Sequence, residues 1–300
     1  MRKVTIFLAI LSIAVLVYGI VQTIETRKTF EVNEDTGLII DNINGSVKII
    51  GWDKDHVDVL VTKKTNHGSE MLDKVDIVMT QKEDIIIETK HLVKNPKVTV
   101  SYELSVPKSI ILKSIQSSNG SINIKNTGSV EIVHTSNGSI NIEKCKGQID
   151  ADTSNGSITV EGIEGSVIAN TSNGKIRLEN ITGFADAKTS NGSIQIYNAG
   201  GIENAKTSNG SIKAQITKMH DDVNINTSNG SIILYLAKSI DADIQASTSN
   251  GRIKLHDLSI TTDNISKSNI SGLIGMGGKL LDVNTSNASI HFYNDDQIEF

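Results

Sequence analysis

A short motif, Ser-Asn-Gly, recurs through the second half of the 300-residue chain at nearly constant spacing. Its asparagines stand at positions 119, 137, 155, 173, 191, 209, 229 and 250, and the motif returns as Ser286-Asn287-Ala288. The first five intervals are 18 residues each, followed by 20, 21 and 37, and a weaker copy at Ser268-Asn269 divides the longest one. A unit this short cannot bury an apolar face alone, so successive units must stack on one another. The sequence therefore predicts a repeat architecture.

Apolar residues within each repeat follow a period of two. Three and five residues after the asparagine stand pairs such as Ile140/Ile142, and six and four residues before the next asparagine stand pairs such as Val167/Ala169. This alternation is typical of strands with one buried face. The 45 isoleucines, against 17 leucines, also favour strands over helices. We expect an all-β, single-chain parallel β-solenoid of about ten coils of 18–21 residues.

The Asn-Gly pairs mark the corners of the expected coils. Both residue types tolerate a left-handed backbone, so we expect that conformation at these corners. Asparagine side chains stacked from coil to coil are also expected to form a ladder of amide hydrogen bonds. A glycine between the two strands of a coil, such as Gly147 or Gly165, marks a second turn.

Residues 30–118 contain strands without the 18-residue spacing. Apolar and polar residues alternate from Val98 to Val106, and shorter runs do so elsewhere. We interpret this part as an irregular β lead-in that caps the solenoid and protects its open edge from aggregation. The expected division is residues 1–29, 30–118 and 119–300, the last being the regular repeats.

The N-terminus begins Met1-Arg2-Lys3 and continues without a charge through residues 4–24. Twenty-one residues would span roughly 30 Å as a helix, the thickness of a bilayer core. The basic flank favours a cytoplasmic N-terminus and places the bulk of the chain outside the plasma membrane as a single-pass protein. The alternative is secretion after signal cleavage near Val17-Tyr18-Gly19. On either reading, residues 1–29 are an anchor or leader with a short linker.

The sequence resembles the bacterial putative adhesin family of unknown function. The resemblance covers nearly everything after residue 30 and rests on three segments: Asn44-Gly45-Ser46-Val47-Lys48-Ile49-Ile50-Gly51-Trp52-Asp53-Lys54-Asp55-His56-Val57, Tyr102-Glu103-Leu104-Ser105-Val106-Pro107 and the Thr-Ser-Asn-Gly-Ser-Ile series. It implies a membrane-anchored or exported β-solenoid, of a kind often encoded beside cell-envelope stress regulators. It implies no catalytic residues.

Charged and nucleophilic residues form no recognisable catalytic or metal-binding pattern. The net charge of -5 gives no basic footprint for nucleic acid. Asp150 and Asp152 point outward on one coil, but the neighbouring coils do not extend them into an acidic cluster. The seven histidines are scattered, and the single cysteine, Cys145, is interpreted as a buried filler. We therefore expect no catalytic residues, no metal site and no cofactor.

One outward row changes character along the solenoid. Six residues after the corner asparagine the side chains are charged in the early coils, and the later coils place Tyr197, Tyr235, His256 and Tyr293 there. Aromatic faces on a flat sheet suit stacking on sugars or on apolar side chains of a partner. Tyr197, Tyr235 and Tyr293 are the candidate ligand-binding residues, with Tyr197 and Tyr235 as the closer pair, two coils or roughly 10 Å apart. The alternative is that tyrosine simply favours strands.

Three functions remain open at this point. The first is a non-catalytic, adhesin-like binding or scaffolding element of the cell envelope, with cell-wall glycan or an envelope protein as its partner. The second is a regulatory partner of a membrane stress-sensing system, which an exposed apolar strip near the membrane would favour. The third is a glycan-processing β-helix enzyme, which an acidic cluster on one sheet would favour.

Overall fold

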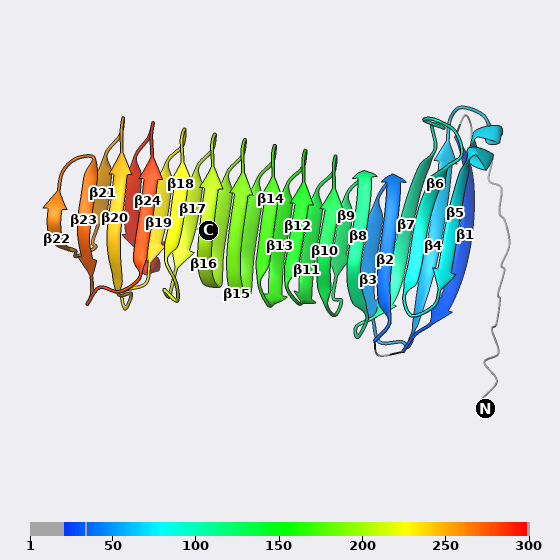
Figure 1. Ribbon diagram of the computed structural model, residues 1–300, viewed down its shortest axis with the longest axis horizontal. Helices are drawn as coiled ribbons and strands as arrows, with labels where there is room; N and C mark the ends of the chain where they lie inside the picture. Colours follow the sequence, from blue (N-terminus) through cyan, green and yellow to red (C-terminus); the bar gives the residue numbers. More distant parts are fainter. Residues whose placement is uncertain (1–20, 34, 299–300) are drawn as a thin grey trace.

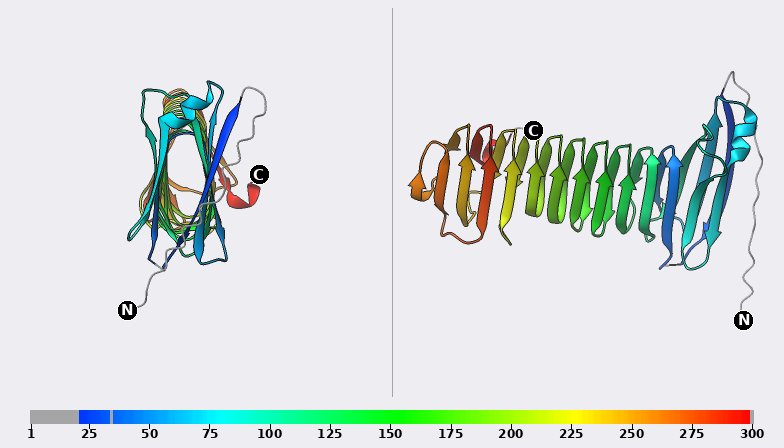
Figure 2. Two further views of the ribbon diagram at one scale, coloured as in Figure 1. Left: turned by 90° about the vertical axis from the view of Figure 1, so that its right-hand side faces the viewer. Right: turned by 45° about the horizontal axis from the view of Figure 1, so that its top comes forward.

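The computed structural model describes residues 21–33 and 35–298, and they form a long rod of stacked strands (Figure 1). Seen along its axis, the rod consists of two facing layers of strands (Figure 2). Besides strands, the described chain has two short 3-10 helices, η1 (Ser69–Lys74) and η2 (Asp295–Gln297). The all-β prediction is confirmed.

Strands of each layer are hydrogen-bonded side by side along the rod. From the N-terminal cap to the opposite tip, the first layer runs β5 (Val75–Gln81), β6 (Ile85–His91), β2 (Gly37–Asn44), β8 (Ile111–Asn119), β10 (Val130–Thr135), β12 (Ile149–Thr153), β14 (Val167–Thr171), the second halves of β15 (Ile176–Thr189) and β16 (Ile194–Thr207), β18 (Val223–Thr227), β24 (Leu280–Thr285), β20 (Ala242–Thr248), β23 (Asn269–Ile274) and β22 (Thr261–Ile265). The second layer runs β1 (Gln22–Glu31), β4 (His56–Thr65), β7 (Thr99–Pro107), β3 (Val47–Trp52), β9 (Ile122–Lys125), β11 (Ile140–Lys146), β13 (Ile158–Glu164), the first halves of β15 and β16, β17 (Ile212–Ile216), β19 (Ile232–Leu236), β25 (Ile290–Asn294) and β21 (Ile253–His256).

Aliphatic side chains fill the space between the layers. Ile122, Ile140 and Ile158 are paired residue to residue in neighbouring parallel strands, and each is fully buried. The same holds for the other inward pairs of the regular coils, so the period-two prediction of the core is confirmed. At the tip, Ile253 and Leu255 are only partly buried, because β21 ends its layer.

The corner motif is held together by two rows of side-chain hydrogen bonds. Each corner asparagine from Asn137 onward donates from Nδ2 to Oδ1 of the asparagine in the neighbouring coil, at 2.7–2.9 Å, which confirms the predicted amide ladder. Two residues before each corner asparagine from Asn137 onward, a threonine donates to the carbonyl of the neighbouring corner glycine, or of Ala288 in one case, as Thr189 does to Gly174 at 3.2 Å. Threonine thereby satisfies a buried carbonyl that the tight corner leaves unpaired.

The expected left-handed backbone at the Asn-Gly corners is wrong. Neither Gly174 nor Asn173 is among the described residues with positive φ, and of the described corner glycines only Gly45, in the cap, has one, at 127°. Glycine is required at this position because a Cβ at Gly174 would lie 1.9 Å from the carbonyl oxygen of Gly156 in the neighbouring coil. The requirement is therefore close approach of two backbones.

A left-handed row does occur, at the opposite turn of the coil, seven residues after the corner asparagine. The residues there have φ between 49° and 68° and are Asn126, Lys144, Gly162, Asn180, Asn198 and Asp257. Of the glycines expected at the second turn with positive φ, Gly147 and Gly165 have it, whereas Gly128, Gly183 and Gly201 do not. Asparagine, aspartate and glycine accept this conformation most readily.

At the tip, the coils are not stacked in sequence order (Figure 1). Strands β24 and β25 pair on one side with β18 and β19 and on the other side with β20 and β21. The C-terminal coil is therefore inserted between two coils that precede it in the chain. The weaker motif at Ser268-Asn269 is not a corner of a parallel coil, since it lies at the turn between the antiparallel strands β22 and β23.

The cap end shows the same out-of-order stacking. Strands β2 and β3 lie between the coil of β8 and β9 and the coil of β6 and β7. Antiparallel strands β5, β4 and β1 then close the end. Part of the expected irregular lead-in is thus a regular coil, and Gly45 belongs to the row of corner glycines, beside Gly120.

The expected membrane helix cannot reach residue 24, because Gln22, Thr23 and Ile24 belong to strand β1. Residues 4–20 of that expected helix lie outside the described residues. Within residues 21–33 and 35–298, no helix is long and apolar enough to cross a bilayer.

Candidate functional site

The aromatic row predicted from the sequence is present, in a different order. Along the second layer, Tyr235 on β19 is paired with Tyr293 on β25, and Tyr293 with His256 on β21. Insertion of the C-terminal coil therefore makes Tyr235 and Tyr293 direct neighbours, with ring centroids 5.5 Å apart. The expectation that Tyr197 and Tyr235 are the closer pair is wrong, because it assumed stacking in sequence order.

The rings of this row face one another along the rod. Tyr293 stacks on His256 with centroids 4.2 Å apart and ring planes 7° from parallel. Tyr197 and Tyr235 are only 5% and 7% exposed, and Lys213 lies between them, 5.8 Å and 5.2 Å from their ring centroids. Burial raises the pKa of Tyr197. The faces of these rings thus pack against neighbouring side chains. A sugar at this row would contact mainly the ring edges and the hydroxyl groups.

The outer surface of the first layer presents a different row, which we call the acceptor row. It runs through strands β12 to β18 and consists of Asp150, Ile168, Asp186, Asn204 and Asn224. Three of its oxygens, Oδ1 of Asp150, of Asp186 and of Asn224, are buried without a hydrogen-bond partner among the described residues. An unpaired buried acceptor is costly, so three in one row call for an explanation.

Asp186 lies at the centre of the acceptor row. It is 8% exposed, and its second oxygen accepts hydrogen bonds from Lys188 at 3.0 Å and from Asn204 at 2.9 Å. Among the described residues, Asp150 has no such donor, and burial, followed by the charge of Asp152, raises the pKa of its carboxyl. The row therefore offers carboxylate and amide oxygens that still need hydrogen-bond donors.

A shallow hollow of about 330 Å³ lies beside the acceptor row, near the Asn-Gly corners. Its charged and amide lining comes from His134, Asp152, Asn170 and Lys188, with threonine and serine hydroxyls from three successive corners. Together, the hollow and the acceptor row form a polar strip that repeats with the coil spacing. The sequence indicated that Asp150 and Asp152 point outward, but the burial of Asp150 Oδ1 and Asp186 Oδ1 has no sequence signal.

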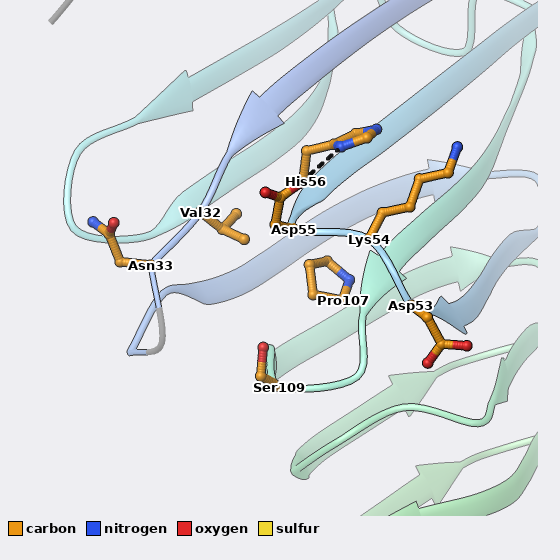
Figure 3. Close-up of a pocket in the computed structure, with 8 residues that line it drawn as sticks. All are labelled: Val32, Asn33, Asp53, Lys54, Asp55, His56, Pro107 and Ser109. Atoms are coloured by element: carbon orange, nitrogen blue, oxygen red, sulfur yellow. Dashed lines mark hydrogen bonds and ion pairs between the residues drawn. The ribbon is translucent and has the colours of Figure 1, made fainter.

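A larger hollow, of about 590 Å³, lies at the cap and is lined by residues from three turns (Figure 3). Its charged groups already have partners: Asp53 with Lys108 at 2.7 Å, and His56 Nδ1 with Asp55 Oδ1 at 3.5 Å. Val32 and Pro107 supply apolar surface. Sequence reasoning missed this hollow because its lining residues are far apart in the chain.

Asp241 and Asp243, near the tip, accept hydrogen bonds from backbone N–H groups. Asp241 Oδ1 accepts from Met276 N at 2.7 Å, and Asp243 Oδ1 accepts from Gly278 N at 2.9 Å. They hold the glycine-rich connection between β23 and the inserted coil. Within the described parts of the chain, no group of three or more histidine, cysteine or acidic side chains is arranged to hold a metal ion.

These features define a β-solenoid with a polar strip on one layer and an aromatic row on the other. The chain matches the Toastrack DUF4097 family over residues 36–291, and it belongs to this family. A search of curated proteins found no match.

Solved structures with a similar chain include proteins from Parabacteroides distasonis and Bacteroides fragilis. A putative lipid binding protein from Parabacteroides distasonis ATCC 8503 is 12% identical, with a TM-score of 0.50, and the match covers 89% of this chain and 96% of that one. A putative adhesin from Bacteroides fragilis NCTC 9343 is 11% identical, with the same coverage and a TM-score of 0.45. At this identity, the first likeness supports the fold alone.

Proposed function

We propose that this protein is a non-catalytic, extracytoplasmic binding or scaffolding element of the bacterial cell envelope. Its membership of the Toastrack DUF4097 family and the naming of similar structures as adhesins agree with a binding role. The apolar N-terminal run with its basic flank supports a membrane anchor. Strand β1 begins at Gln22, at the cap end, so such an anchor would hold the rod by its cap (Figure 1).

The choice of ligand rests on the acceptor row. Asp150 and Asp186 are separated by two coils, about 10 Å from two inter-strand spacings. Between them stands Ile168, which offers an apolar contact. A polymer with regularly spaced hydroxyl donors and apolar ring faces matches this alternation. We therefore assign a cell-wall glycan as the ligand class.

The test replaces the acceptors by the residue that the chain itself uses in the same row. Asp150→Ile together with Asp186→Ile should fold normally, because Ile132 and Ile168 occupy equivalent positions in the neighbouring coils. Retention on purified cell wall should fall to background. The matched control is Thr159→Ile on β13, which adds an isoleucine to the outer face of the other layer and should bind like the wild type.

Circular dichroism at matched concentration establishes that all variants fold. Wild-type retention by the Asp150→Ile, Asp186→Ile variant would refute the assignment of the acceptor row. Equal loss in the Thr159→Ile control would show that the effect is not specific to that row.

A further inference from the structure

One loop of the cap exposes large apolar side chains. Leu92 and Val93, directly after β6, are 56% and 43% exposed, and Val21, directly before β1, is 47% exposed. Exposed apolar residues gathered at one place mark interaction surfaces more often than isolated ones do. The backbone places the loop firmly, since Leu92 N donates to Lys74 O at 2.9 Å.

The apolar loop lies beside the point where β1 begins. Gln22 is paired with Thr65 in the β1–β4 ladder, and Thr65 Oγ1 donates to Lys97 O at 2.9 Å. A single residue, Thr65, therefore contacts both the first residue of β1 and the end of loop 92–97.

No spacer separates β1 from the apolar N-terminal run. That run ends at the residues that enter β1, and 20 residues precede the described chain. Given the anchor of the proposed function, on which this step rests, the surface of the bilayer must lie at the start of β1. Loop 92–97 is then forced into its immediate neighbourhood.

Charges on the loop suit an anionic surface. Lys94 and Lys97 are exposed, and within the described chain neither forms an ion pair. Helix η1, whose last residue accepts from Leu92 N, carries two acidic residues, Glu70 and Asp73, and one basic residue, Lys74. Lysines beside an anionic bilayer are attracted by its surface potential, and adjacent apolar side chains enter the headgroup layer.

The shape of the loop is fixed from within. Pro96 between the two lysines is buried, and the flanking Asn95 and Lys97 have left-handed φ values of 53° and 59°. Such conformations persist only where the surroundings enforce them. The buried proline keeps Leu92, Val93 and Lys94 on the outside.

We infer that loop 92–97 is a second membrane contact, which places Leu92 and Val93 in the headgroup layer of an anionic bilayer beside the N-terminal anchor. This contact fixes the orientation of the cap on the membrane, which a single spanning segment would leave free to rotate.

The test uses the full chain in vesicles of phosphatidylglycerol and phosphatidylcholine. A polarity-sensitive fluorophore is attached at Leu92→Cys or, as the distal control, at Met276→Cys, whose site is 88% exposed at the tip. Native Cys145 is buried, and burial raises the pKa of its thiol, so it stays unlabelled in the folded protein. Lipid-attached quenchers report contact with the bilayer.

We expect several-fold stronger quenching at Leu92 than at Met276, and most of the difference should disappear in a Lys94→Gln, Lys97→Gln background or at high salt. Equal quenching at both sites in chains that float with the vesicles would overturn the loop contact and leave the anchor intact. Failure of the chain to float would overturn the anchor and the loop contact together. Protection of Leu92 in native membranes but not in protein-free vesicles would assign the loop to a membrane protein and overturn the lipid contact.

Discussion

Substituting Gly174 tests why glycine occupies every regular corner. A Cβ at this position would lie 1.9 Å from the Gly156 oxygen, whereas real contacts of this kind are not shorter than 3.0 Å. The two coils must therefore separate locally by about 1 Å. Both Gly174→Ala and Gly174→Asn introduce this Cβ, so both should destabilise the protein alike.

The cost follows from the hydrogen bonds that the separation breaks. Three hydrogen bonds join the two coils at this corner: Thr171 Oγ1 to the Gly156 carbonyl at 3.0 Å, Asn173 Nδ2 to Asn155 Oδ1 at 2.9 Å, and Asn173 N to the Ser154 carbonyl at 2.9 Å. At about 1 kcal/mol each, their loss amounts to about 3 kcal/mol of unfolding free energy. Ala288 occupies the same row in the inserted coil, beside Gly230, where Thr285 donates to the Gly230 carbonyl at 2.9 Å.

Guanidinium unfolding followed by far-ultraviolet circular dichroism measures the loss. A left-handed corner would instead accept asparagine much better than alanine. A Gly174→Asn variant within about 0.5 kcal/mol of the wild type would therefore refute the close-approach explanation.

Three further predictions concern single side chains. Gly162 has φ +68°, and no atom lies nearer than 3.6 Å to an added Cβ. Gly162→Asn should therefore leave the unfolding free energy nearly unchanged, whereas Gly162→Val should lower it by more than about 1 kcal/mol. Equal denaturation midpoints of the two variants would contradict a left-handed turn there. Asp150→Ile should raise the unfolding free energy at pH 7 by about 1–2 kcal/mol, because burial raises the pKa of Asp150 and its charged form opposes folding. That advantage should shrink as the pH falls toward the ordinary carboxyl value of 3.8, where the wild type takes up the proton, and a gain independent of pH would argue against it. The pKa of His291 is lowered by burial and by the charges of Lys254 and His256, so the unfolded chain takes up a proton more readily than the folded one as the pH falls below 6.5. The wild type should therefore lose more stability between pH 7 and pH 5 than His291→Phe. An equal decrease in melting temperature for both proteins would show that His291 does not contribute to this pH dependence.

Much of the fold could be predicted because each coil carries the same local chemistry. Period-two apolar pairs specify which side chains face inward, and the 18-residue spacing brings Asn137 level with Asn119. The backbone geometry of the corner could not be predicted in this way. Left-handed φ and close backbone approach both select glycine, and only the distance from Gly174 to the next coil distinguishes them.

The stacking order at the two ends was not predictable from the sequence. The corner chemistry that predicts the middle of the rod is the same in every coil, so it does not specify which coils are neighbours. Asn287 accepts from Asn250 and donates to Asn229, and each contact is chemically identical to one between consecutive coils. A corner of this type fits any other corner, so sequence proximity alone favours consecutive stacking. The order of Tyr235, Tyr293 and His256 in the aromatic row depends on this insertion.

The candidate site was visible in the sequence only as a list of outward residues. Alternation along the strand places Asp150 and Asp186 outside. Whether an outward oxygen is solvated or buried depends on the side chains of neighbouring coils, such as Lys188 and Asn204 around Asp186. The cap hollow depends on three turns that meet only in the folded chain.

Labelling in intact cells tests the proposed extracytoplasmic location of the rod most directly. In a Gram-positive host, a membrane-impermeant maleimide is applied to cells that carry Met276→Cys, whose exposed site lies at the tip of the rod. The wild type, with buried Cys145 alone, serves as the control and should react only after unfolding. We predict that Met276→Cys is labelled on intact cells to the same extent as after lysis. Labelling that requires lysis would place the rod inside the membrane barrier and contradict an extracytoplasmic function.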